Sequence, residues 1–169
     1  MQVILLLLKI IGSVLIISSA FLIGNSKSRK LYNRHDFLKS FIVFLNSLST
    51  AIRYETMDIF LTISSCIRDE NLSYISIKEN TQPFDKQWQK QILSLPGSLS
   101  LKKSDIELLI EFGNELGKTD IEGQLKHIDL YKTLFNKELI SAEEEILNKS
   151  KLYKIMGLFV GISTTLMII

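Results

Sequence analysis

The sequence predicts an all-α protein, a cytoplasmic bundle of about five or six helices flanked by N-terminal and C-terminal transmembrane helices. Three observations predict this class. Both ends of the 169-residue chain are apolar runs. Between them, apolar residues recur at spacings of three and four, which is the period of one helix face. The chain also holds only two prolines and eight glycines, so long helices meet few breaks.

Composition excludes several classes of protein. Apolar residues make up 46% of the chain and charged residues 22%, as in ordinary folded proteins. The net charge of +2 gives no strong field toward nucleic acid, so we expect no nucleic-acid partner. Cys66 is the one cysteine, which rules out an internal disulfide and a four-thiolate zinc site.

The first apolar run, residues 1–24, predicts a transmembrane helix. Lys9 is its only charged residue. As a helix it would be about 36 Å long, enough for a hydrocarbon core of about 30 Å. A cleaved signal peptide is the alternative. However, no basic residue precedes the run and Lys9 interrupts it, which disfavours cleavage.

The last apolar run, residues 155–169, predicts a second transmembrane helix. These fifteen uncharged residues give only about 22 Å of helix. Starting at Leu152 extends the helix to about 27 Å, with Lys154 reaching up to the headgroups. A buried core helix is the alternative, but the lysines just before the run favour a membrane end.

Charge predicts the orientation. Residues 25–39 carry a net charge of +4, and residues 148–154 hold three lysines and no acid. Because positive flanks stay in the cytoplasm, residues 25–154 are expected inside and both termini outside. Residues 40–147 carry a net charge of −6, as a soluble domain between two anchors would.

The middle of the chain shows successive helical faces. One face runs from Leu31 to Ile52, with no glycine or proline after Asn25, so the first span is expected to continue into this helix. Shorter faces cover residues 59–67 and 84–95, and Pro96-Gly97 breaks the chain. Residues 71–83 are less clear; a helix followed by a loop is favoured, and a strand stays open.

Two capping boxes mark the next two helices. Ser104 with Glu107 predicts the start of one, and Thr119 with Glu122 the start of the other, with Gly117 ending the first. Such a short link predicts an antiparallel hairpin. The second helix meets no proline before Lys154, so it is expected to run on into the second span, over close to 50 residues in all.

No catalytic motif is present, so the sequence predicts neither an enzyme nor a cofactor. There is no phosphate-binding loop of the P-loop type and no HExxH, DxDxDG or CxxC. Asp120, Gln124 and His127 share one helix face. A hydrogen-bonded layer that fixes packing is the favoured interpretation, a partner-docking face is the second, and a metal site completed by another helix is the third.

Small residues follow one side of the second span. Gly157, Gly161 and Thr165 form a row that allows close helix–helix approach in lipid. The predicted partner is either the first span, where Gly12, Ser13 and Ser19 offer small residues, or another copy of the chain in a homo-oligomer.

Residues 99–130 resemble the stage III sporulation protein AB family. An N-terminal span, a helix containing Tyr54 and a C-terminal apolar tail follow that family's order, so the resemblance covers the whole chain. The family tends to have an acidic residue where Ala51 stands and a Thr-Pro turn near Met57-Asp58. The shared motifs are Leu101-Lys102-Lys103-Ser104, Phe112-Gly113, Leu116-Gly117, Asp120, Gln124 and Lys126-His127-Ile128.

The resemblance implies a function. Such proteins look like a half-size version of the inner-membrane platform protein of type II secretion and type IV pilus machines. They act in the mother-cell membrane around the forespore, in the stage III sporulation A transenvelope channel, and spore formation requires them. The implied partners are the stage III sporulation protein AA ATPase and other subunits of that complex.

The shared motif adds Lys102 and Lys103 to Asp120, Gln124 and His127 as packing or partner-docking residues. Two other functions stay open on the sequence alone. One is a two-span pore-forming or purely scaffolding membrane protein. The other is a membrane-anchored enzyme that uses Asp120 and His127.

Overall fold

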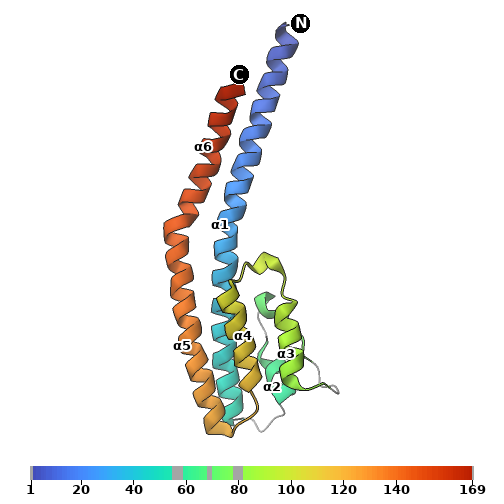
Figure 1. The fold of residues 1–169 in the computed structure, drawn as a ribbon, viewed down its shortest axis with the longest axis vertical. Helices are drawn as coiled ribbons and strands as arrows, with labels where there is room; N and C mark the ends of the chain where they lie inside the picture. Colours follow the sequence, from blue (N-terminus) through green and yellow to red (C-terminus); the bar gives the residue numbers. More distant parts are fainter. Residues whose placement is uncertain (1, 55–58, 68–69, 78–81, 169) are drawn as a thin grey trace. The chain divides into compact units, whose positions relative to one another are not determined.

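The protein is described by a computed structural model that covers residues 2–54, 59–67, 70–77 and 82–168. The secondary structure in these ranges is helical, with no strand (Figure 1). The all-α prediction is therefore confirmed, and the alternative of a strand within 71–83 finds no support in the part described. The predicted departure at Met57-Asp58 lies outside the described residues.

Two helical runs are long: α1 has 53 residues, and α5, a π-helical turn and α6 follow each other without a break. The helical continuity predicted for both ends of the chain is thus confirmed, while the membrane spans themselves stay predictions. In chain order the α-helices are α1 (Gln2–Tyr54), α2 (Ile59–Cys66), α3 (Phe84–Leu93), α4 (Lys103–Glu115), α5 (Ile121–Glu145) and α6 (Lys151–Ile168), with 3₁₀ turns at Glu70–Leu72 and Gly97–Leu99 and the π-helical turn at Ile146–Ser150.

The chain forms two compact units. The terminal unit consists of Met1–Tyr32 and Glu143–Ile169, and the central unit consists of Asn33–Ala142. Membrane and cytoplasmic boundaries at residues 24 and 155 remain predictions, because the two units are defined by contacts within the protein and not by a bilayer.

The central unit is built around aromatic rings. Phe41 on α1 lies at the middle of this core, with its ring centroid 4.6 Å from that of Phe135 on α5 and 5.7 Å from that of Phe112 on α4. Trp88 on α3 packs against Phe112 at 5.8 Å. All four side chains are fully buried, so the core joins α1, α3, α4 and α5.

Trp88 explains a glycine on the facing helix. The indole nitrogen of Trp88 donates a hydrogen bond to the backbone oxygen of Leu109, 2.6 Å away. This bond holds the ring against α4 one turn before Gly113, where an added Cβ would overlap the indole. Gly113 is therefore required for the close approach of α3 and α4.

Both predicted capping boxes are shifted in the structure. The N-cap of α4 is Lys102, whose backbone nitrogen donates to Asp105 Oδ2 at 2.7 Å, while Ser104 is exposed inside the first turn. The start of α5 is capped by Asp120, whose Oδ1 accepts from the Gly123 nitrogen at 2.9 Å. In each case a carboxylate, and not the predicted hydroxyl, accepts the hydrogen bond from the backbone at the start of the helix.

The α4–α5 turn agrees with the predicted hairpin. Gly117 follows the C-cap of α4 with a φ of 82°, the left-handed conformation expected of a terminating glycine. Beyond the turn, α5 packs on α4 through the stacked rings of Phe112 and His127, whose centroids are 5.4 Å apart.

Candidate functional site

The five residues predicted for packing or partner docking do not share one surface. Lys102 and Lys103 lie at the start of α4, whereas His127 bonds to Phe112 in its last turns and Gln124 bonds to Gly117 just after its end. Along α4 the rise from Lys103 to Phe112 is already about 14 Å. Each group therefore has to be considered separately.

Gln124 and His127 bond to their own chain. Gln124 Oε1 accepts from the Gly117 nitrogen at 3.0 Å, and its Nε2 donates to Thr119 Oγ1 at 2.9 Å. His127 Nε2 lies 2.9 Å from the Phe112 oxygen, and because a carbonyl only accepts, this nitrogen carries the proton. Two of the three residues of the favoured interpretation, Gln124 and His127, thus form hydrogen bonds within the chain, whereas Asp120 caps its own helix. These hydrogen bonds also occupy the groups that a metal would need, and the described residues hold no cluster of three metal-ligating side chains.

The two lysines and Asp120 face solvent. Lys102 and Lys103 are exposed, and Lys103 Nζ lies 3.5 Å from Glu107 Oε1 across one helical turn. Such exposed pairs contribute little to stability. The start of α4 thus presents two cations on the surface of the central unit, and Asp120 is exposed at the start of α5.

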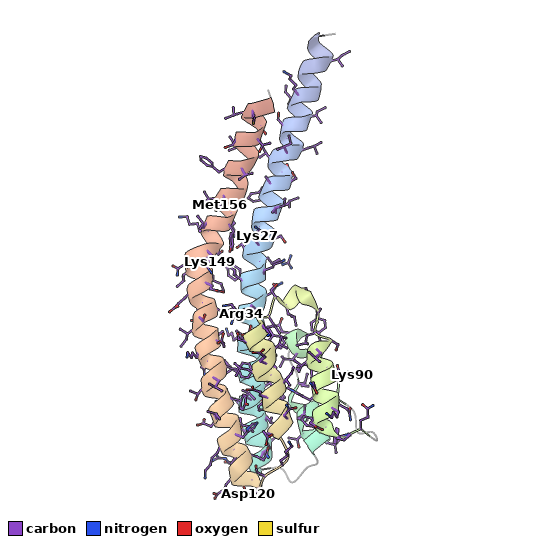
Figure 2. All side chains as sticks on the ribbon, in the orientation of Figure 1. Lys27, Arg34, Lys90, Asp120, Lys149 and Met156 are labelled. Atoms are coloured by element: carbon purple, nitrogen blue, oxygen red, sulfur yellow. The ribbon has the colours of Figure 1, made fainter. Side chains whose placement is uncertain are left out.

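A buried ion-pair network at the start of α4 was not predicted from the sequence; Figure 2 labels its member Arg34. Arg34 on α1 donates from Nε to Asp105 Oδ2 at 2.7 Å and from Nη2 to Asp105 Oδ1 at 2.8 Å. Its Nη2 also donates to Glu138 Oε2 on α5 at 2.6 Å. The side chains of Arg34 and Asp105 are 3% and 0% exposed, so a buried two-pronged ion pair joins α1 to α4, and the contact with Glu138 adds α5.

Electrostatics around Arg34 favour its charged form. Burial alone would lower the pKa of its guanidinium, but the hydrogen bonds and charges of Asp105 and Glu138 outweigh burial and raise that pKa above its ordinary value. The guanidinium of Arg34 therefore stays charged at any physiological pH. A sequence signal was present: Arg34 lies three and four residues before Phe37 and Leu38, on the apolar face of α1.

In the terminal unit, the predicted glycine row packs against α1 of the same chain. A Cβ on Gly157 would lie 2.7 Å from the Ala20 oxygen, and one on Gly161 would lie 3.0 Å from the Ile17 Cα. Thr165 is buried and donates to the Gly161 oxygen at 2.9 Å. The two backbones thus approach as closely as small residues permit.

The matching side of α1 differs from the predicted one. Gly12 has open space around it and Ser19 is exposed, so these two residues of the expected row do not make the contact. The contacts are instead made by Ala20, Gly24 and Ser28, which are four residues apart and therefore share one face. Ser28 Oγ lies 2.8 Å from Ser150 Oγ, and both serines are buried.

One described helix is long and apolar enough to cross a membrane by length and composition. It is the part of α1 from Lys9, and only 6% of its most apolar window is buried. A second span stays a prediction. Large side chains on both helices of the terminal unit are exposed, which suits contact with lipid; they include Ile11, Leu15, Leu22, Ile23, Phe159, Leu166 and Met167.

The fold and the site define a class of protein. It is all-helical, it begins with an apolar helix, and its described part holds no catalytic cluster. Residues 9–169 match the model of the stage III sporulation protein AB family, so the chain belongs to that family. It is similar to stage III sporulation protein AB of Bacillus subtilis (strain 168), with 25% identity over 96% of this chain and 99% of the relative. No solved structure matches it.

Family membership supports a role in sporulation. The family is one of sporulation proteins and not a known family of enzymes.

Proposed function

We propose that this protein is a non-enzymatic membrane platform in the stage III sporulation A transenvelope channel, where residues 25–154 dock a cytoplasmic secretion-type ATPase. Family membership supports the sporulation part of the proposal. One observation carries the platform part. Two unbroken helical runs, α1 and α5 through α6, each join an apolar end of the chain to the core of the central unit.

The ion-pair network supplies a mechanical link in this proposal. Arg34 holds α1 to Asp105 at the start of α4 and to Glu138 on α5. A partner that displaces α4 would therefore pull on α1, which continues toward the predicted first span. This mechanical role would account for a buried charge that takes no part in catalysis.

The exposed lysines at the start of α4 are the proposed contact for the ATPase. Lys102 and Lys103 face solvent, and Lys103 pairs with an exposed glutamate that a partner can displace. Gln124 and His127 are assigned to packing, since their polar atoms bond within the chain. Other subunits of the complex and a second copy of the chain are further proposed partners.

Co-purification tests the docking proposal. The full-length protein is expressed with its cognate ATPase and extracted in mild detergent. The wild type is compared with the double variant Lys102→Glu/Lys103→Glu. We expect co-elution with the wild type and at least a tenfold loss with the variant. Lys86→Glu/Lys90→Glu makes the same charge change on α3 and should co-elute normally. Equal retention by all three proteins, or none by the wild type, would contradict the proposed contact.

A further inference from the structure

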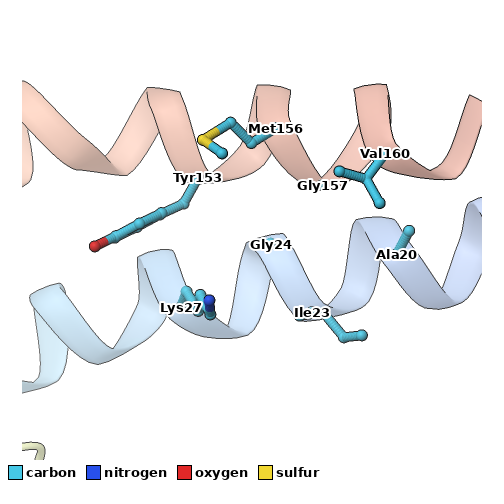
Figure 3. Close-up of a pocket in the computed structure, with 8 residues that line it drawn as sticks. All are labelled: Ala20, Ile23, Gly24, Lys27, Tyr153, Met156, Gly157 and Val160. Carbon is cyan, nitrogen blue, oxygen red and sulfur yellow. The ribbon is translucent and has the colours of Figure 1, made fainter. Parts of the chain in front are cut away.

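The terminal unit contains an apolar groove with a cation beside it. Eight residues, four from α1 and four from α6, line a space of about 230 Å³ (Figure 3). Those that decide its character are Ala20, Gly24 and Lys27 on α1 and Tyr153, Met156 and Val160 on α6. We propose that this groove holds part of one acyl chain of an anionic phospholipid whose phosphate pairs with Lys27. The inference rests on the membrane insertion of α1 and α6 that the proposed function assumes.

The groove arises from the unequal sizes of its lining residues. Gly24 and Gly157 bring the two backbones together, with a Cβ on Gly24 only 3.2 Å from the Gly157 Cα. The larger side chains of Ile23, Met156 and Val160 lie around this contact (Figure 3). The resulting surface is an apolar groove, which suits a hydrocarbon chain better than a polar ligand.

Both helices place the groove at the same depth. On α1, Lys27 comes three residues after the predicted span 1–24 ends. On α6, Tyr153 and Lys154 come directly before the predicted span 155–169 begins. Tyrosine and lysine are the residues that gather at the boundary between headgroups and hydrocarbon. The groove is therefore expected at the cytoplasmic edge of the bilayer, where a headgroup and its acyl chain meet.

Charge around the groove favours an anionic headgroup. Residues 1–35 and 146–169 contain no acidic residue. Arg29, Lys30 and Lys151 add to the charge of Lys27, and all four side chains are exposed. Glu145, the nearest acid along α5, is paired with Lys149 at 3.3 Å. Basic pockets between transmembrane helices on the cytoplasmic side commonly bind anionic lipid headgroups.

A second copy of this chain is a poorer occupant. Its matching surface would carry the same cluster of cations and no acid from those segments, so the two copies would repel each other at the groove. A zwitterionic lipid could enter the groove, but it would gain little from Lys27. The anionic phospholipid is the occupant that uses both the apolar lining and the charge.

Lipid retention on the full-length protein tests the proposal. The protein is extracted from vesicles of equimolar phosphatidylglycerol and phosphatidylcholine, and native mass spectrometry counts the lipids that remain bound. We expect one retained phosphatidylglycerol, preferred about fivefold over phosphatidylcholine, as one lysine near an anionic surface contributes. Lys27→Gln should abolish this preference. Arg29→Gln removes the same charge two residues away, outside the groove lining, and should keep it.

A second pair of variants tests the apolar part of the site. Met156→Trp fills the groove and should abolish retention of either lipid, whereas Leu158→Trp lies outside the lining and should not. Equal retention of phosphatidylglycerol and phosphatidylcholine by the wild type would overturn the proposal. So would an equal loss of the phosphatidylglycerol preference with Lys27→Gln and Arg29→Gln, because that result shows a diffuse basic surface instead of a site. Failure of the protein to float with vesicles after an alkaline wash would instead refute membrane insertion itself.

Discussion

At the scale of single residues, Arg34 has the strongest predicted effect on stability. It carries a charge into the core and is balanced there by Asp105, which is fully buried, and by Glu138. Removing one member of such a pair leaves the other charged, buried and without its main partner. The largest loss of stability is therefore expected when one member of the network is removed and the others remain.

We predict that Arg34→Met lowers the free energy of unfolding by about 3 kcal/mol. Urea unfolding of the full-length protein in detergent, followed by circular dichroism, measures this loss. Arg34→Met/Asp105→Asn should recover at least half of it, because the uncompensated carboxylate is gone. Lys39→Met removes an exposed charge from the same helix and should change the free energy by less than about 0.5 kcal/mol. If Arg34→Met lowered the free energy of unfolding by no more than Lys39→Met does, the network would not stabilise the core.

Gly113 gives a second residue-scale prediction. A Cβ there would overlap the indole of Trp88, so Gly113→Ala should cost about 1–3 kcal/mol through overpacking. Trp88 is the one tryptophan in the chain, so its emission should also shift to longer wavelength as the ring is displaced toward solvent. Gly97→Ala is the matched control, since nothing lies within 4 Å of its added Cβ, and it should leave both readings unchanged.

Tyr131 predicts how stability depends on alkaline pH. Burial, with the charges of Glu111 and Glu115, raises the pKa of its phenol above the ordinary value of 10.0. The unfolded chain therefore loses this proton first as pH rises, so stability falls once pH passes about 10, by at most about 1.4 kcal/mol per pH unit. Tyr131→Phe should flatten this fall in unfolding measurements between pH 9 and 11. An unchanged slope would show that Tyr131 does not contribute.

The periodicity of the sequence predicts which apolar residues are buried, and the structure confirms these predictions. Leu38, Phe41, Leu45 and Leu48 lie on the predicted face of α1 and are buried. Periodicity cannot show that Arg34 meets Asp105, because their contact joins positions 71 residues apart and depends on the path of the chain. Asp105 also accepts a local hydrogen bond from the Lys102 nitrogen, and Lys102 is the N-cap of α4 in place of the predicted Ser104.

At the scale of elements, the pairing of α1 with α6 decides how the terminal unit is built. Ala20, Gly24 and Ser28 on α1 meet the region from Ser150 to Gly161 of the same chain. The predicted small row on α6 was visible in the sequence. Its partner face on α1 was not, because several small residues lie along that helix and spacing alone does not choose among them.

A designed disulfide tests this pairing. In a Cys66→Ser background, Ser28→Cys/Ser150→Cys should form an intramolecular bond under mild oxidation, since the two serine oxygens are 2.8 Å apart. Adding Gly157→Leu should reduce the yield severalfold, because the larger side chain separates the helices. Gly12→Leu, which has open space, should not. Crosslinks that appear only between two chains on a non-reducing gel would contradict pairing within one chain.

At the scale of the whole molecule, the proposed platform needs unbroken helices. Inserting Gly-Ser-Gly-Ser after Leu147 would interrupt the run from α5 to α6. We expect the count of heat-resistant spores to fall at least a hundredfold while the protein is still made and inserted. The same insertion between Pro96 and Gly97, where the chain already turns, should be tolerated. Normal spore counts with the first insertion would exclude mechanical coupling.

The central claim is that both ends of the chain cross the membrane and leave the central unit inside. Single cysteines at Gln2, at Lys103 and after Ile169, each in a Cys66→Ser background, test it with a membrane-impermeant maleimide on intact growing cells that express the protein before any forespore forms, so that the outer face of the plasma membrane is open to the reagent. The account predicts labelling of both terminal positions and none of Lys103→Cys until the cells are lysed. Labelling of Lys103→Cys in intact cells, or a C-terminal cysteine that reacts only after lysis, would contradict it.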